Sequence, residues 1–157
     1  AAKLRAHRRL YEGRMLRQPG ELAIVTQEGV AAVDEAIAAL ERQRPVPPLA
    51  HDDALALAAY DHVMDQGPKG ALGHTSSDGR TFTHRFVRRG LQPYGGENIA
   101  YGSPRSAEAV LLQLLVDDGV PDRGHRKNIF NAAYKRVGAA CGPHVAYRYM
   151  CVTDFGY

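Results

Sequence analysis

The C-terminal end of the chain constrains the fold most, because it has the pattern of an antiparallel hairpin. Side chains alternate between two faces over residues 147–155, and this period of two residues predicts a strand. We expect a preceding strand over residues 136–141 and a short third strand over residues 97–101. These strands would form a small antiparallel sheet.

Most of the chain before the hairpin has apolar residues at helical spacing. Apolar residues recur every three or four positions, which predicts helices that include residues 30–40, 55–63, 82–86 and 110–115, with one more turn over 125–130. We expect Asp52 or Asp53 to cap the second helix, and Ser103, followed by Pro104, to cap the fourth. Helices followed by late antiparallel strands predict an α+β fold and not a parallel βαβ sheet.

The two cysteines, Cys141 and Cys151, flank the expected hairpin. Positions equidistant from a hairpin tip can face each other across the two strands. We therefore favour a disulfide, which needs an oxidising compartment. Two buried free thiols are the alternative.

The composition is that of an ordinary folded domain. The chain has 157 residues, of which 45% are hydrophobic and 24% are charged, and this length suits one domain with a core. The net charge of +3 is mild, and the basic residues are not gathered on a motif with interleaved aromatics, so we expect no nucleic-acid partner. No apolar run approaches the ~18 residues that a membrane span needs. We expect no transmembrane segment and favour a monomer.

Residues 1–28 differ from the rest of the chain in charge. Between Lys3 and Arg17 they hold six basic residues and a single acidic one, Glu12. We interpret them as a basic, partly helical N-terminal extension that precedes a domain over residues 29–157. A solvated arm is the simplest role for it, and binding to an anionic membrane or cell-wall polymer is the alternative.

Three polar residues in separate segments are the candidates for chemistry. His74 follows Leu-Gly, Glu97 lies in a Gly-Glu-Asn-Ile-Ala stretch, and His125 is the second residue of a Gly-His-Arg-Lys-Asn-Ile stretch. Two imidazoles and a carboxylate would suit zinc with an open position for water or a ligand. Because the chain has neither His-Glu-x-x-His nor Cys-x-x-Cys, spacing alone does not establish a metal site. A hydrogen-bonded Glu–His pair without metal is the alternative.

In combination, these stretches resemble the bacterial form of the CAP superfamily, which comprises the cysteine-rich secretory, antigen 5 and pathogenesis-related-1 proteins with their SCP-like domain. The resemblance covers roughly residues 30–157. It implies an α–β–α sandwich in which a small antiparallel sheet of about three strands lies between helices.

The resemblance also implies a cavity built from two histidines and two acidic residues. His74, Glu97 and His125 match three of these positions. The fourth falls at Asp117 or Asp118, and we favour Asp118.

The same resemblance implies a secreted or cell-envelope protein that binds a divalent cation, most simply zinc, through His74 and His125. A lipid, a sterol or a cell-wall component would bind beside it, with Tyr94 and Tyr101 as candidates to line the cleft. One alternative is a metal-dependent, peptidase-like hydrolase with Glu97 as the catalytic general base. The other is a structural or interaction domain without catalysis.

Overall fold

The computed structural model describes residues 1–102 and 106–157. The chain divides into two compact units, one formed by residues 1–45 and 111–126, the other by residues 46–110 and 127–157. Helices α5 (Ala107–Val116) and α6 (Gly124–Ile129) continue from one unit into the other. The cap expected at Ser103 and Pro104 lies outside the described residues. Ser106 accepts a hydrogen bond from the Ala109 N–H at 3.1 Å, as N-cap side chains do.

The larger unit contains a four-stranded sheet in the order β4-β6-β7-β5. Strands β5 (Gly96–Gly102), β7 (Arg148–Gly156) and β6 (Arg136–His144) are antiparallel, as predicted. A two-residue strand, β4 (Ala50–His51), pairs in parallel with β6 and is too short to leave a sequence pattern. Cys141 and Cys151 are directly opposite in the hairpin and form the expected disulfide.

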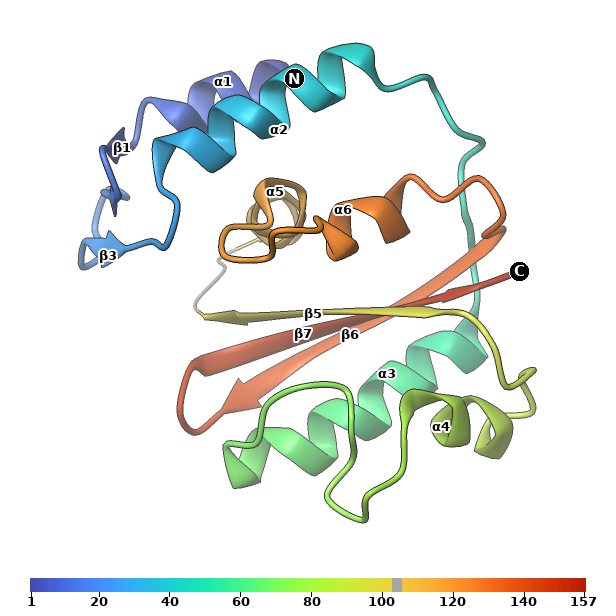
Figure 1. Ribbon diagram of the computed structural model, residues 1–157. Coiled ribbons are helices and arrows are strands. Elements are labelled where there is room, and N and C mark those ends of the chain that lie inside the picture. Colours follow the sequence, from blue (N-terminus) through green and yellow to red (C-terminus); the bar gives the residue numbers. More distant parts are fainter. Residues whose placement is uncertain (103–105) are drawn as a thin grey trace. The chain divides into compact units, whose positions relative to one another are not determined.

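Two helices cover one face of this sheet, α3 (Asp53–Gln66) and α4 (Phe82–Arg88), as Figure 1 shows. A short 3-10 turn, η1 (Gly67–Lys69), extends α3. Of the two residues predicted to cap this helix, Asp52 is the cap, since its carboxylate accepts the Leu55 N–H at 3.0 Å. The core between helix and sheet consists of Ala59, Val63, Ile99, Met150 and Val152.

Helix α3 lies close to β6 because Gly138 carries no side chain. A Cβ atom at this position would lie 2.0 Å from the Ala56 nitrogen. With the helices of both units, the antiparallel strands confirm the predicted α+β class.

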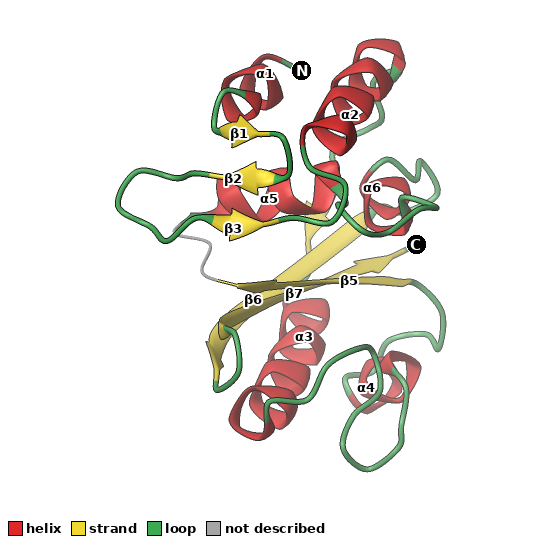
Figure 2. Ribbon diagram, turned by 60° about the vertical axis from the view of Figure 1, so that its left-hand side comes forward, coloured by secondary structure: helices red, strands yellow, loops and turns green. Residues whose placement is uncertain are grey.

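The smaller unit contains α1 (Ala2–Arg8), α2 (Val30–Arg42) and a minimal sheet of β1 (Tyr11–Glu12), β2 (Met15–Leu16) and β3 (Ile24–Val25), seen in Figure 2. Helix α1, at the start of the basic stretch 1–28, packs against α2 and is not a solvated arm. The side chain of Leu4 is buried with the apolar face of α2, and Arg8 pairs with Asp34 of α2. Within the described part of the chain, no helix is both long and apolar enough to span a membrane.

Candidate functional site

The candidate residues lie in both units, and each unit holds one carboxylate–histidine pair. His74 and Glu97 belong to the larger unit, and His125 belongs to the smaller unit with Asp117 and Asp118. We describe each pair within its own unit.

His74 and Glu97 are in direct contact. The Nδ1 atom of His74 lies 2.8 Å from Oε1 of Glu97, and Arg85 of α4 pairs with the other carboxylate oxygen. The side chain of Glu97 is fully buried, whereas that of His74 is 49% exposed. Burial alone would raise the pKa of Glu97, but the His74 hydrogen bond and the Arg85 charge outweigh it and lower the pKa.

These contacts determine the tautomer of His74. An ionised carboxylate only accepts hydrogen bonds, so Nδ1 of His74 must carry the proton that is donated to Glu97. In the neutral imidazole the lone pair is then on Nε2, the atom available to a cation or a ligand proton.

The loop that carries His74 is fixed to the helices and to the sheet. Tyr101 on β5 accepts the Gly73 N–H at 2.9 Å and donates to Gln66 of α3 at 3.0 Å. Gln66 in turn donates to the carbonyl oxygens of Gly73 and Thr75. Tyr101 therefore supports the His74 loop.

A buried acid that the sequence prediction missed lies next to Glu97. Asp154 on β7 is the direct cross-strand partner of Glu97, and it is completely buried. Its signal was present in the sequence, because Asp154 shares the alternation of Met150 and Val152 and therefore points to their buried face.

His125 pairs with Asp117. The Nδ1 atom of His125 lies 2.6 Å from Oδ1 of Asp117, and the other carboxylate oxygen accepts the backbone N–H groups of His125 at 3.0 Å and Arg126 at 3.3 Å. As at His74, a carboxylate acceptor places the proton on Nδ1 and the lone pair on Nε2.

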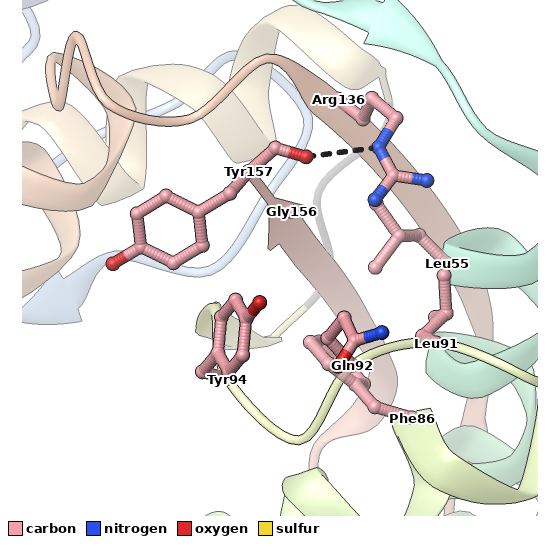
Figure 3. Close-up of a pocket in the computed structure, with 8 residues that line it drawn as sticks. All are labelled: Leu55, Phe86, Leu91, Gln92, Tyr94, Arg136, Gly156 and Tyr157. Atoms are coloured by element: carbon pink, nitrogen blue, oxygen red, sulfur yellow. Dashed lines mark hydrogen bonds between the residues drawn. The ribbon is translucent and has the colours of Figure 1, made fainter.

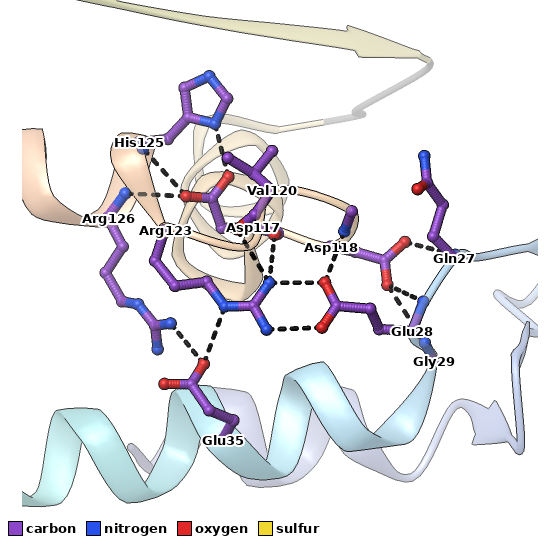
Figure 4. Close-up of polar contacts among 11 residues, drawn as sticks. Gln27, Glu28, Gly29, Glu35, Asp117, Asp118, Val120, Arg123, His125 and Arg126 are labelled. Carbon is purple, nitrogen blue, oxygen red and sulfur yellow. Dashed lines mark hydrogen bonds and ion pairs between the residues drawn. The ribbon is translucent and has the colours of Figure 1, made fainter.

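Asp118 has a different role from the one we favoured. Its carboxylate accepts the backbone N–H groups of Gln27, Glu28 and Gly29, at 2.7, 2.7 and 3.2 Å, at the N-terminus of α2 (Figure 4). The backbone of Asp117 has a left-handed conformation, with φ of 57°, so the two neighbouring side chains point to different elements. These contacts assign the acidic position beside His125 to Asp117 in place of Asp118.

Arg123 holds this turn together. Its guanidinium binds both oxygens of Glu28, at 2.6 and 2.7 Å, and contacts Glu35 of α2 at 3.2 Å. It also donates to the carbonyl oxygen of Asp117 at 2.8 Å (Figure 4). The loop over residues 119–123 therefore braces the residue that holds His125.

Tyr94 does not join Tyr101. It lines a small cavity of about 60 Å³ with Tyr157 and Leu91, where Arg136 donates to the Tyr157 carbonyl oxygen at 3.1 Å (Figure 3). His62 is a buried core histidine that donates from Nε2 to the Gly73 carbonyl oxygen at 2.9 Å.

The Gly-Glu-Asn-Ile-Ala stretch and the Gly-His-Arg-Lys-Asn-Ile stretch are also in contact through their asparagines. The Asn128 amide on α6 donates to the side-chain oxygen of Asn98 on β5 at 2.8 Å. A sequence model of the cysteine-rich secretory protein family, CAP, matches residues 5–155. The chain belongs to the CAP family. The match includes most of residues 1–28, the N-terminal extension that the charge pattern predicts.

Solved structures of three other bacterial proteins share the fold. An extracellular protein containing an SCP domain from Bacillus anthracis is 22% identical, with 82% of this chain and 38% of that chain covered at a TM-score of 0.57. An outer surface protein from Borrelia burgdorferi is 20% identical, with 81% of this chain and 89% of that chain covered at a TM-score of 0.57. A cysteine-rich secretory protein from Staphylococcus aureus is 12% identical, with 82% of this chain and 38% of that chain covered at a TM-score of 0.51.

The present CAP chain thus spans 38% of the length of the first and third of these proteins. These likenesses show the CAP fold that the resemblance implies. A comparison with curated protein sequences gives no match.

The nitrogen donors of this CAP domain suit a divalent cation, because His74 and His125 each contact a carboxylate through Nδ1 and carry the lone pair on Nε2. A preformed metal site would also need several ligands close together. Among residues 1–102 and 106–157, no group of three or more His, Cys, Asp or Glu side chains is placed to hold a metal ion.

Proposed function

We propose that this chain is a secreted or cell-envelope CAP domain whose His74 and His125 imidazoles are ligands for divalent cations and that binds a small apolar ligand. The observation that carries the proposal is the equivalent carboxylate contact on Nδ1 of both imidazoles. Metal-binding histidines usually donate their other ring N–H to a carboxylate, which orients the ring and raises its basicity. Zinc is the simplest cation for such nitrogen ligands.

The contacts of Glu97 favour binding over hydrolysis. A general base needs a carboxylate that can reach a substrate proton or water. Both oxygens of Glu97 are already engaged, by His74 and by Arg85, and its side chain is fully buried. Glu97 thus orients His74 in this proposal and does not accept a substrate proton.

An apolar groove supports a lipid-like ligand in preference to a polar cell-wall component. The groove measures about 400 Å³ and lies between α3 with η1 and the β6–β7 hairpin of the larger unit, a volume in the range of small-molecule sites. Its walls include Tyr60, Met64 and Val145, which are 48%, 54% and 73% exposed. Large exposed apolar side chains that share a groove indicate a binding surface.

The disulfide and the relatives support an extracytoplasmic location. Disulfides persist in oxidising compartments, and Cys141 and Cys151 are bonded. Two structural relatives are described as an extracellular protein and an outer surface protein. Secretion or attachment to the envelope is therefore part of the proposal.

Calorimetric titration of the chelator-stripped protein with zinc tests the proposed cation binding. We expect binding that weakens at least tenfold in His74→Ala and in His125→Ala. His84→Ala is the matched control, because His84 is an exposed histidine of α4 outside both pairs. Affinity unchanged in both single variants, or no zinc binding at all, would overturn the proposal.

A further inference from the structure

Two buried carboxyl groups, those of Glu97 and Asp154, are neighbours in the sheet of the larger unit. Strand β5 pairs with β7 so that Glu97 is directly opposite Asp154. By strand alternation both side chains share the sheet face of Ile99, Met150 and Val152, which pack against α3. The side chain of Glu97 is fully buried and Asp154 is 0% exposed. Directly opposite residues of neighbouring strands have Cβ atoms about 4.5–5.5 Å apart.

Among the described residues, Arg85 is the permanently charged cation that pairs with this acid pair, because the His74 ring beside Glu97 is charged only when it is protonated. Arg85 from α4 pairs with Glu97. His62 from α3 does not supply a second charge, because burial lowers its pKa. Strand β6 contributes Gly138 opposite Asp154, and glycine has no side chain. In the part of the chain that the structure describes, neither oxygen of Asp154 forms a hydrogen bond of ordinary geometry. The Glu97 carboxylate is nevertheless close enough for a side-chain contact with Asp154 to help raise the pKa of Asp154.

An ionised Asp154 would therefore be an uncompensated buried charge. Such a charge is costly enough that a buried carboxyl normally keeps its proton. Burial, and then the neighbouring Glu97 charge, raise the pKa of Asp154 to about 9. With Asp154 neutral, Glu97 and Arg85 balance each other.

We propose that Asp154 is a buried carboxylic acid that keeps its proton at neutral pH and, by donating it towards Glu97, positions the Glu97 carboxylate for His74. Asp154 is thus a positioning residue that acts through Glu97. Glu97 stays the acceptor for His74 Nδ1–H because the single proton of the acid pair is on Asp154. The proposal holds whether or not His74 binds a cation.

Carboxyl ¹³C NMR of the wild-type protein tests the protonation directly, with the Asp154 signal assigned by its loss in Asp154→Asn. We expect a titration midpoint within about a unit of pH 9, against about 3.9 for an unperturbed aspartate. A midpoint below about pH 7 would overturn the proposal.

Unfolding equilibria give a second, independent readout. Between about pH 6 and 8 the folded wild type holds the Asp154 proton and the unfolded chain does not, so higher pH favours unfolding. Relative to Asp154→Asn, the unfolding equilibrium constant of the wild type should rise about tenfold per pH unit. The matched control Asp65→Asn should show a constant difference over this range, because the pKa of Asp65 is about 2 in the folded state. A constant difference for Asp154→Asn as well would contradict the proposal.

The positioning role is tested by long-range ¹H–¹⁵N NMR of the His74 ring. In Asp154→Asn the side-chain amide can donate to Glu97 as the acid does, so His74 should keep its Nδ1–H tautomer. In Asp154→Ala this donor is lost, and the Nδ1–H population should fall. A His74 spectrum unchanged in Asp154→Ala would show that Asp154 does not position Glu97.

Discussion

Oδ1 of Asp117 lies 2.6 Å from Nδ1 of His125, and Oε1 of Glu97 lies 2.8 Å from Nδ1 of His74. The two pairs are built differently. Glu97 projects from a strand into a core beside Arg85, whereas Asp117 follows the end of α5 in a left-handed conformation. Both give a histidine whose Nε2 carries the lone pair, and this shared property is the basis of the proposed cation binding.

Mutations of Asp117 and Asp118 should have different effects, one on zinc affinity and the other on stability. Asp117→Asn removes the carboxylate charge that faces Nδ1 of His125. Loss of the carboxylate that holds a metal-binding histidine typically weakens metal binding 10–100-fold. Asp118→Ala removes the acceptor for three N–H groups at the start of α2 and should lower the free energy of unfolding by about 1–2 kcal/mol. Zinc calorimetry and thermal unfolding of both variants check this. A larger loss of zinc affinity in Asp118→Ala than in Asp117→Asn would contradict the assignment.

Asp65 should stabilise the protein in a pH-dependent manner. Burial would raise its pKa, but hydrogen bonds from Lys69 and Ser77 outweigh this and lower the pKa to about 2. Because the folded-state pKa is depressed, the stabilisation is present above the ordinary pKa of an aspartate and is lost as the pH falls towards 2. Asp65→Asn should cost about 1–2 kcal/mol at neutral pH and almost nothing near pH 2. Denaturant unfolding at several pH values measures this, and an equal cost at all of them would refute it.

The hairpin disulfide should contribute measurable stability. Cys141 and Cys151 close a loop with a sequence separation of 10, and the chain-entropy estimate for so short a loop is roughly 2–3 kcal/mol. The double variant Cys141→Ser, Cys151→Ser should unfold at lower denaturant by this amount. Reductant should destabilise the wild type equally and leave the double variant unchanged. A wild type that is insensitive to reductant while its thiols are shown to be free would contradict the prediction.

The apolar groove should bind a fluorescent fatty acid analogue. Met64→Asp places a charge in the groove wall and should weaken that binding at least tenfold. Leu57→Asp is the matched control, because Leu57 is on the same helix and is 47% exposed, close to the 54% of Met64, but does not line the groove. Equal binding by both variants would remove the groove from the account.

The sequence predicted those features that depend on local periodicity. Helix α3, its cap at Asp52 and the pairing of Cys141 with Cys151 all follow from residues close together in the chain or symmetric about one turn. The partners of the site depend on distant segments. Asp117 and Asp118 cannot be distinguished without the positive φ of Asp117 and the position of the α2 N-terminus.

The acid pair illustrates the same limit on a sheet. Alternation places Asp154 on a buried face. That it lies opposite Glu97, however, depends on the register of two strands about 50 residues apart in sequence. Local patterns fix neither the register nor the single Arg85 charge that the two acids share.

The most direct test of the account is long-range ¹H–¹⁵N NMR of the histidine rings during a zinc titration of the chelator-stripped protein. The account predicts that His74 and His125 begin as Nδ1–H tautomers, that zinc shifts their Nε2 signals, and that Nδ1 stays protonated throughout. Rings that start as the Nε2–H tautomer, or Nε2 signals that do not respond to zinc, would contradict it.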